Sequence, residues 1–122
     1  MPDFYIGRQQ NGFLYRQTNG NVNNRPIYKC VRGSVVNDRS KLYFLFTDRE
    51  GRMIAVEDDA NAANPVATGV PQFRSINPVP NVEIDGLQIE WQQHDTSTDP
   101  PSWGWNQQHW VTFAQGNNPV AQ

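Results

Sequence analysis

The sequence predicts an all-β fold, a small antiparallel sandwich or barrel of seven to eight short strands in a single domain covering residues 1–122. Three observations predict it. Short apolar runs alternate with polar residues, turn-forming residues recur about every 8–12 positions, and no stretch has the apolar period of an ordinary helix. This combination is typical of β-sandwiches and small barrels. A β-trefoil-like arrangement is the alternative.

The first strands are predicted from aromatic-rich runs and the turn residues between them. Residues 3–8 and 13–16 are expected to form a hairpin, because an Asn-Gly dipeptide separates them. Asparagine-rich residues 19–24 are expected to form a loop, since Asn tolerates left-handed backbone. Residues 26–32 alternate without a clean apolar face, so this strand is expected to be partly exposed on both sides.

The most apolar run, residues 41–47, predicts a central strand that pairs with residues 52–57 across a polar turn. We expect this hairpin to be the centre of stability. In the segment that follows, Pro65, Gly69 and Pro71 limit any helix to about one turn.

The remaining strands are predicted from shorter patterns. Residues 72–76 form a short strand, and residues 82–91 form a half-buried strand with a turn or bulge at its Asp-Gly pair. A polar loop is expected over 93–102 and a last strand over 108–113. The tail, residues 115–122, is expected to fray.

Composition narrows the function classes. A single cysteine, Cys30, excludes an intramolecular disulfide and is expected to be a buried apolar residue. No apolar stretch is long enough for a membrane-spanning helix and no basic-then-apolar leader opens the chain, so no membrane partner is expected. The compartment, extracellular or cytoplasmic, is left open.

Charge is distributed unevenly along the chain. Residues 1–52 contain nine of the ten basic residues, whereas residues 53–122 contain eight of the twelve acidic ones. In one small domain the two halves are expected to mix in space. The acidic pI of about 5.5 and the distance in sequence between the aromatic cluster and the basic residues argue against a nucleic-acid partner.

All four tryptophans lie between Trp91 and Trp110, in a segment without Lys or Arg. Trp91 and Trp110 fall at alternating strand positions and are assigned to the core. Trp103 and Trp105 lie in the polar loop, on the same side of the chain if the segment is extended. Flat apolar rings beside amides suit a sugar or another neutral polar ligand. The predicted ligand-binding residues are Trp103, Trp105, Asn106, Gln107, Gln93 and Asp95.

Other chemistries are weaker hypotheses. A metal site at His94 and His109 lacks a third good ligand, so no metal and no cofactor are predicted. Cys30 has no local sequence pattern of a catalytic nucleophile. The acidic residues Glu83, Asp85 and Glu90 are not brought together by any pattern, and residues 57–64 lack the spacing of a calcium loop.

Several short motifs resemble a small tryptophan-containing β module of extracellular and multidomain proteins. They are Asn11-Gly12 with Tyr15, then Asn24-Arg25-Pro26-Ile27-Tyr28-Lys29, Leu42-Tyr43-Phe44, and Gly51-Arg52-Met53-Ile54. Met53 stands where the pattern has tryptophan, and an additional Trp-Gly-Trp lies near the end. The resemblance implies no catalytic residues. A weaker likeness to β-trefoil lectins rests on spaced aromatic strands and glycine turns, without the threefold repeat.

The sequence therefore predicts a non-catalytic binding module whose ligand is a carbohydrate or another neutral polar molecule. A protein-interaction or structural module is the second hypothesis, because tryptophan is also enriched at interface hot spots. A small enzyme with a pocket inside a β-barrel is the third. The oligomeric state is not predicted.

Overall fold

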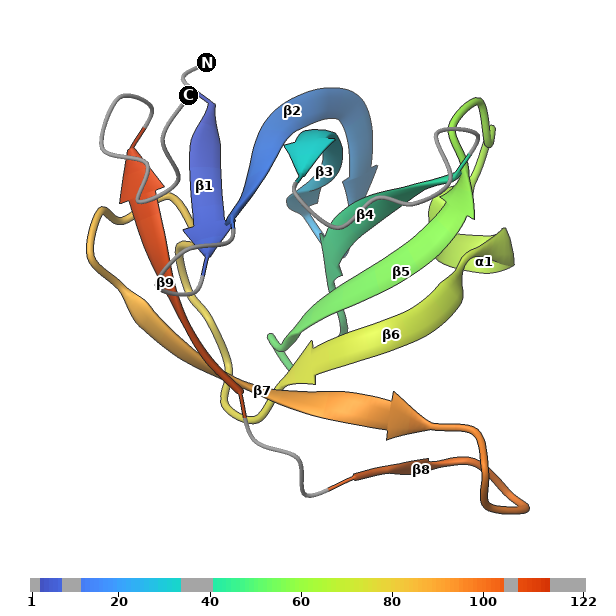
Figure 1. Cartoon of the computed structure of the whole chain (residues 1–122). Helices are drawn as coiled ribbons and strands as arrows, with labels where there is room; N and C mark the ends of the chain where they lie inside the picture. The colour runs from blue at the N-terminus through green and yellow to red at the C-terminus, as the bar shows by residue number, and fades with distance from the viewer. Residues whose placement is uncertain (1–2, 8–11, 34–40, 105–107, 115–122) are drawn as a thin grey trace.

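The chain folds into a closed antiparallel barrel of eight strands with a ninth strand outside it (Figure 1). This computed structural model describes residues 3–7, 12–33, 41–104 and 108–114. The elements are β1 (Phe4–Gly7), β2 (Gly12–Val22), β3 (Arg25–Gly33), β4 (Lys41–Thr47), β5 (Met53–Asp59), α1 (Pro65–Thr68), β6 (Val70–Ser75), β7 (Gln88–Asp95), β8 (Ser102–Trp103) and β9 (Gln108–Ala114). The predicted all-β class is confirmed, in its barrel form.

The barrel is a meander in which strands that follow one another in the chain lie side by side. The order around the wall is β6-β5-β4-β3-β2-β1-β9-β7, and pairing of β6 with β7 closes it. Among the described residues, strand β8 pairs only with the end of β7, and it lies outside the wall. Within the described part of the chain, no helix is long and apolar enough to cross a membrane.

The second hairpin, β2–β3, differs from the prediction in where its turn lies, whereas the strands of the first hairpin are confirmed. Strands β1 and β2 pair as expected, from Phe4↔Tyr15 to Gly7↔Gly12, and the intervening residues 8–11 lie outside the described residues. The loop predicted over 19–24 is wrong, because β2 continues to Val22. Only Asn23 and Asn24 form the turn, with φ of 53° and 61°, which asparagine tolerates better than most residues.

Alternating side chains of the barrel strands fill its interior. The buried interior residues are Phe4, Ile6, Phe13, Tyr15, Tyr28, Cys30, Leu45, Met53, Ala55, Ile89, Trp91 and Trp110. The prediction that residues 26–32 are exposed on both faces is wrong. Tyr28 and Cys30 are buried inside, whereas Val31, 39% exposed, faces out. Closure of the wall buries the side chains of Tyr28 and Cys30 on its inner face.

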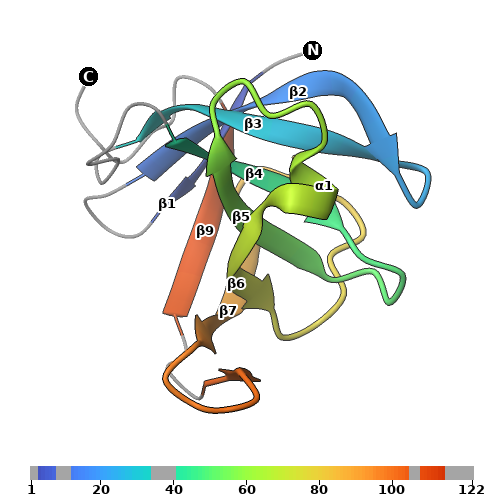
Figure 2. The same cartoon turned by 90° about the vertical axis from the view of Figure 1, so that its right-hand side faces the viewer.

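A second, smaller apolar cluster covers the outer face of the predicted 41–57 hairpin. Strands β4 and β5 pair along their whole length, so this hairpin is confirmed. Phe44, Phe46 and Val56 are buried outside the barrel. Helix α1, the single predicted helical turn, lies against β5 and brings Val66 onto the cluster (Figure 2). The side chain of Asn64 accepts a hydrogen bond from the backbone N–H of Ala67 and caps the helix.

Residues 76–87 form a capping loop across one end of the barrel. The strand predicted over 82–91 therefore begins only at Gln88. Gly86 adopts a φ of 82°, a conformation outside the extended region, so β7 cannot extend to the residues that precede it. Val79 and Val82 of the capping loop are buried in the interior cluster. Val82, which the sequence pattern placed in a strand, therefore helps to close the end of the barrel.

Candidate functional site

The tryptophan-rich segment forms a two-stranded ribbon that extends β7 beyond the barrel (Figure 1). The first half of β7 pairs with β9, and residues 91–93 pair with β6. Beyond them, His94 pairs with Trp103 and Asp95 pairs with Ser102. The loop predicted over 93–102 is therefore wrong at both of its ends, where the chain is extended and paired.

Local hydrogen bonds explain why this polar segment makes a ribbon. The carboxylate of Asp95 accepts from the backbone N–H of Ser97 at 2.9 Å and from the Ser97 hydroxyl, which turns the chain back. The Ser97 hydroxyl first, and its backbone N–H second, lower the pKa of Asp95. The N–H of Gly104 donates to the carbonyl of Gln93 at 2.8 Å. These hydrogen bonds thus stabilise the ribbon although it contains few apolar residues.

Trp103 is half-buried and contacts two side chains on one face of the ribbon. The guanidinium carbon of Arg74 lies 4.3 Å from the centroid of an indole ring, a cation–π arrangement. The imidazole of His94 lies 4.8 Å from the indole, tilted by 47°. Both contacts restrict the ring, so Trp103 presents a fixed and partly accessible aromatic surface.

Arg74 connects this surface to the barrel wall. Its Nη2 donates to Oε1 of Gln92 at 3.0 Å, and its strand, β6, pairs with β7 through the Arg74↔Gln92 pair. Burial is the main cause that lowers the pKa of Arg74, and the nearby charge of Arg52 adds to it. Nε of Arg74 and Nδ1 of His94 are buried without a hydrogen-bond partner. Arg74 and His94 are therefore held in place, and each has one buried nitrogen whose hydrogen-bonding capacity is not satisfied.

The ribbon separates two of the predicted site residues from Trp103. Residues paired across a ladder share a face, and neighbours along a strand alternate. Trp103 therefore shares its face with His94, whereas Gln93 and Asp95 lie on the opposite face. A Cβ on Gly104 would lie 3.9 Å from that of Asp95, consistent with this alternation.

The site that the structure assembles differs in membership from the one predicted. Trp105, Asn106 and Gln107 lie outside the described residues. Arg74 and Gln92 were missed, because nothing in the local sequence links β6 to Trp103. Arg74 is nevertheless the single basic residue after Arg52, which could have drawn attention to it.

The core assignment of the other two tryptophans is confirmed. Trp91 is 0% exposed and Trp110 is 6% exposed, and their rings lie 5.6 Å apart inside the barrel. Phe73 and Phe13 contact Trp110 at 5.0 and 5.9 Å. These two indoles fill space and are not available to a ligand.

The structure does not assemble the alternative chemistries within the described residues. Cys30 is completely buried inside the barrel, near Tyr15 and Tyr43. His109 instead lies on the outer face beside Gln88 and Glu90. Among the described residues, no group of three His, Cys, Asp or Glu side chains is placed to hold a metal ion.

A pocket of about 210 Å³ lies between the capping loop and the β2–β3 and β4–β5 turns. Two of the side chains that line it, Arg25 and Tyr28, are paired with the capping loop. Arg25 donates to the carbonyl of Pro80, and the hydroxyl of Tyr28 donates to the Glu83 carboxylate at 3.2 Å. Burial, and then the Glu83 charge, raise the pKa of Tyr28 to about 12. These bonds hold the capping loop and leave little for a ligand to satisfy.

No family model, curated protein sequence or solved structure matches this chain. The resemblances described from the sequence motifs therefore stay predictions. The candidate site rests on the geometry of Trp103, Arg74 and His94.

Proposed function

We propose that this protein is a non-catalytic binding module that holds a carbohydrate against Trp103. One observation carries the proposal. A half-buried indole is fixed by Arg74 and His94 on a ribbon outside the barrel, instead of filling the core as Trp91 and Trp110 do. A rigid aromatic surface loses little conformational entropy when a ligand stacks on it.

The neighbouring polar groups suit a ligand that carries hydroxyls. Arg74 and Gln92 offer guanidinium and amide donors on the same face as Trp103, and His94 offers a ring nitrogen. The apolar C–H face of a sugar ring would lie on the indole, and its hydroxyls would reach these groups. Gln93 and Asp95, on the other face, have no part in this arrangement.

A protein partner is the second candidate function. Tryptophan and arginine are the residues most enriched at binding hot spots, and here they stack on each other. The projecting ribbon would give such a partner access without contact with the barrel wall.

The test compares binding by the unaltered protein and by two variants on opposite faces of the ribbon. A glycan array identifies ligands, and intrinsic tryptophan fluorescence titrations then measure their affinity. Trp103→Ala should weaken binding by about 1–3 kcal/mol, taking stacking on sugar as comparable to stacking on a base. Gln93→Ala is the matched control and should bind normally.

The proposal fails if no glycan binds, or if Trp103→Ala and Gln93→Ala bind equally well. Loss of a captured protein partner on Trp103→Ala, without any glycan binding, would favour the second candidate. Circular dichroism spectra of both variants establish that the barrel is folded in each titration.

A further inference from the structure

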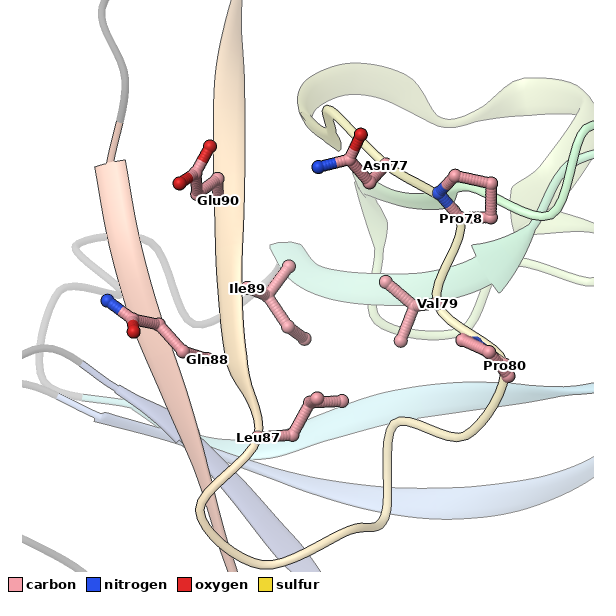
Figure 3. A pocket seen from close by; sticks show the side chains of 8 residues that line it. All are labelled: Asn77, Pro78, Val79, Pro80, Leu87, Gln88, Ile89 and Glu90. Carbon is pink, nitrogen blue, oxygen red and sulfur yellow. The ribbon is translucent and has the colours of Figure 1, made fainter.

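A second pocket lies on the other side of the capping loop, between the loop and the start of β7 (Figure 3). Its volume is about 170 Å³. It is lined by Asn77, Pro78, Val79, Pro80, Leu87, Gln88, Ile89 and Glu90. It lies where β6 has ended and the capping loop diverges from β7, so it is a split in the barrel wall.

Apolar side chains form the inside of this split. Leu87, at the end of the capping loop, and Ile89 of β7 point toward Val79 on the other side of the split (Figure 3). The side chains of Gln88 and Glu90 instead turn to the outer face of β9. There Nε2 of Gln88 lies 3.4 Å from Nδ1 of His109, and Oε1 of Glu90 lies 3.8 Å from the same atom. The side chains that point into the split are therefore mainly apolar, whereas Asn77 and backbone groups add polar surface to its lining.

The backbone of β7 is only half paired at this place. Pairing of β6 with β7 ends at Ser75↔Trp91, apart from one bond from the Ile76 N–H to the Glu90 carbonyl. In an antiparallel ladder, each residue directs its own N–H and C=O to the same neighbouring strand, and every second residue along the strand faces the same neighbour. Gln88 therefore directs both of its backbone groups to the side of the Glu90 carbonyl, where β6 no longer runs.

No strand of the described chain reaches Gln88 on that side. Its pair in β9, Val111, lies across the other edge, where the neighbouring bond runs from the Thr112 N–H to the Leu87 carbonyl. The N–H and C=O of Gln88 thus face the split, and no described strand pairs with them there. Backbone groups in such a setting gain most from a partner that supplies both complementary groups.

We propose that this split binds a small neutral molecule with an apolar body and a cis secondary amide, whose N–H and C=O lie on the same edge as they do in a lactam. The amide N–H of the ligand donates to the Gln88 carbonyl, and its C=O accepts from the Gln88 N–H. The apolar body packs on Val79, Leu87 and Ile89. A cavity of about 150 Å³ lined by apolar residues is enough to take up benzene, so a single six-membered ring fits. This site is separate from the Trp103 ribbon and does not depend on its function.

The probe is δ-valerolactam, a six-membered cyclic amide, titrated into isotope-labelled protein and followed by nuclear magnetic resonance. We expect saturable shifts of the Gln88 backbone N–H and of the Val79 and Leu87 methyl groups. N-methyl-δ-valerolactam, which lacks the donor, should bind about tenfold more weakly, the value of roughly one hydrogen bond. Toluene tests whether apolar size alone is sufficient.

Two filling variants test the place of binding. Leu87→Phe adds volume next to the start of β7, where the side chain is only half-buried, and Val79→Phe adds it from the opposite side of the split. Either folded variant should abolish the lactam-induced shift at Gln88. Gln93→Ala, at the other end of β7, should leave it unchanged.

The proposal is overturned if δ-valerolactam gives no saturable shift at Gln88. It is also overturned if the N-methylated lactam or toluene binds as tightly as δ-valerolactam, because the backbone N–H and C=O of Gln88 then contribute nothing to binding. Unchanged binding by a folded filling variant would equally reject it. Loss of glycan binding at Trp103 in other experiments does not affect these outcomes.

Discussion

Trp91 and Trp103 belong to the same polar segment, and the fold treats them in opposite ways. Trp91 has a ladder partner on each side, Ser75 in β6 and Gln108 in β9, and is completely buried. Trp103 has one partner, His94, on a ribbon outside the wall. The number of neighbouring strands, and not the local composition, distinguishes the indole that fills the core from the indole that lies outside it. The predictions below test this contrast.

The largest effect is expected at Trp91. Trp91→Ala removes a side chain that is 0% exposed and in ring contact with Trp110, and leaves a cavity in the middle of the barrel. The free energy of unfolding should fall by about 3–5 kcal/mol. Chemical denaturation followed by circular dichroism measures it. A loss of stability no larger than that of Trp103→Ala would show that Trp91 does not differ from Trp103 in its contribution to the core.

Phe44 tests whether a residue on the outer face of the wall can act like a core residue. It is 4% exposed, although it lies outside the barrel interior, because the outer cluster and α1 cover it. Phe44→Ala should cost about 3 kcal/mol in the free energy of unfolding. Val31→Ala, an exposed outer-face position on β3, is the control and should change it by about 0.5 kcal/mol or less. Equal effects at the two positions would mean that α1 does not seal this cluster.

A much smaller effect on stability is expected at Trp103. Trp103→Ala removes the cation–π contact with Arg74 and the contact with His94, but no interior packing. The free energy of unfolding should fall by about 0.5–1 kcal/mol. Thermal and chemical unfolding of this variant, beside Gln93→Ala, measure the difference. A loss comparable to that of Trp91→Ala would mean that the ribbon is part of the core.

The last test concerns the pH dependence of stability and the bond that holds the capping loop to Tyr28. Burial and the Glu83 charge raise the pKa of Tyr28 from 10.0 to about 12, so the folded protein binds this proton more tightly than the unfolded chain. This contribution to stability is complete below pH 10 and is lost as pH rises through about 12. Unfolding measured over this range should show a shallower pH dependence for Tyr28→Phe. Tyr15 and Tyr43 also have raised pKa values, so some dependence should remain. An unchanged slope would mean that Tyr28 does not hold the loop through its hydroxyl.

Much of the fold could be predicted because strand alternation and turn residues are local properties. The β4–β5 hairpin, the single turn of α1 and the strand ending near Phe113 follow directly from such patterns. Barrel closure could not be predicted in the same way. It depends on the β6–β7 and β1–β9 pairings between distant residues, and it is closure that buries Tyr28 and Cys30.

The candidate site was predicted less well, for a related reason. Sequence reasoning selected Trp103 from its polar surroundings, but assumed that nearby amides in the chain would be nearby in space. Strand alternation places Gln93 on the opposite face, and a neighbouring strand supplies Arg74. A cation–π partner from another strand leaves no trace in the local sequence.

The meander has a consequence for the order in which the protein folds. Most of its pairings join strands that are neighbours in the chain, such as β4 and β5, and these close short loops at low entropic cost. The pairing of Phe4 with Ala114 joins residues more than a hundred positions apart. Closing a loop of that length costs about 4 kcal/mol of chain entropy, so we expect β1 and β9 to meet late, after the hairpins exist. Until that step is complete, we expect the tryptophans of β7 and β9 to remain in contact with water. Their fluorescence should therefore report when β1 pairs with β9 and the barrel closes.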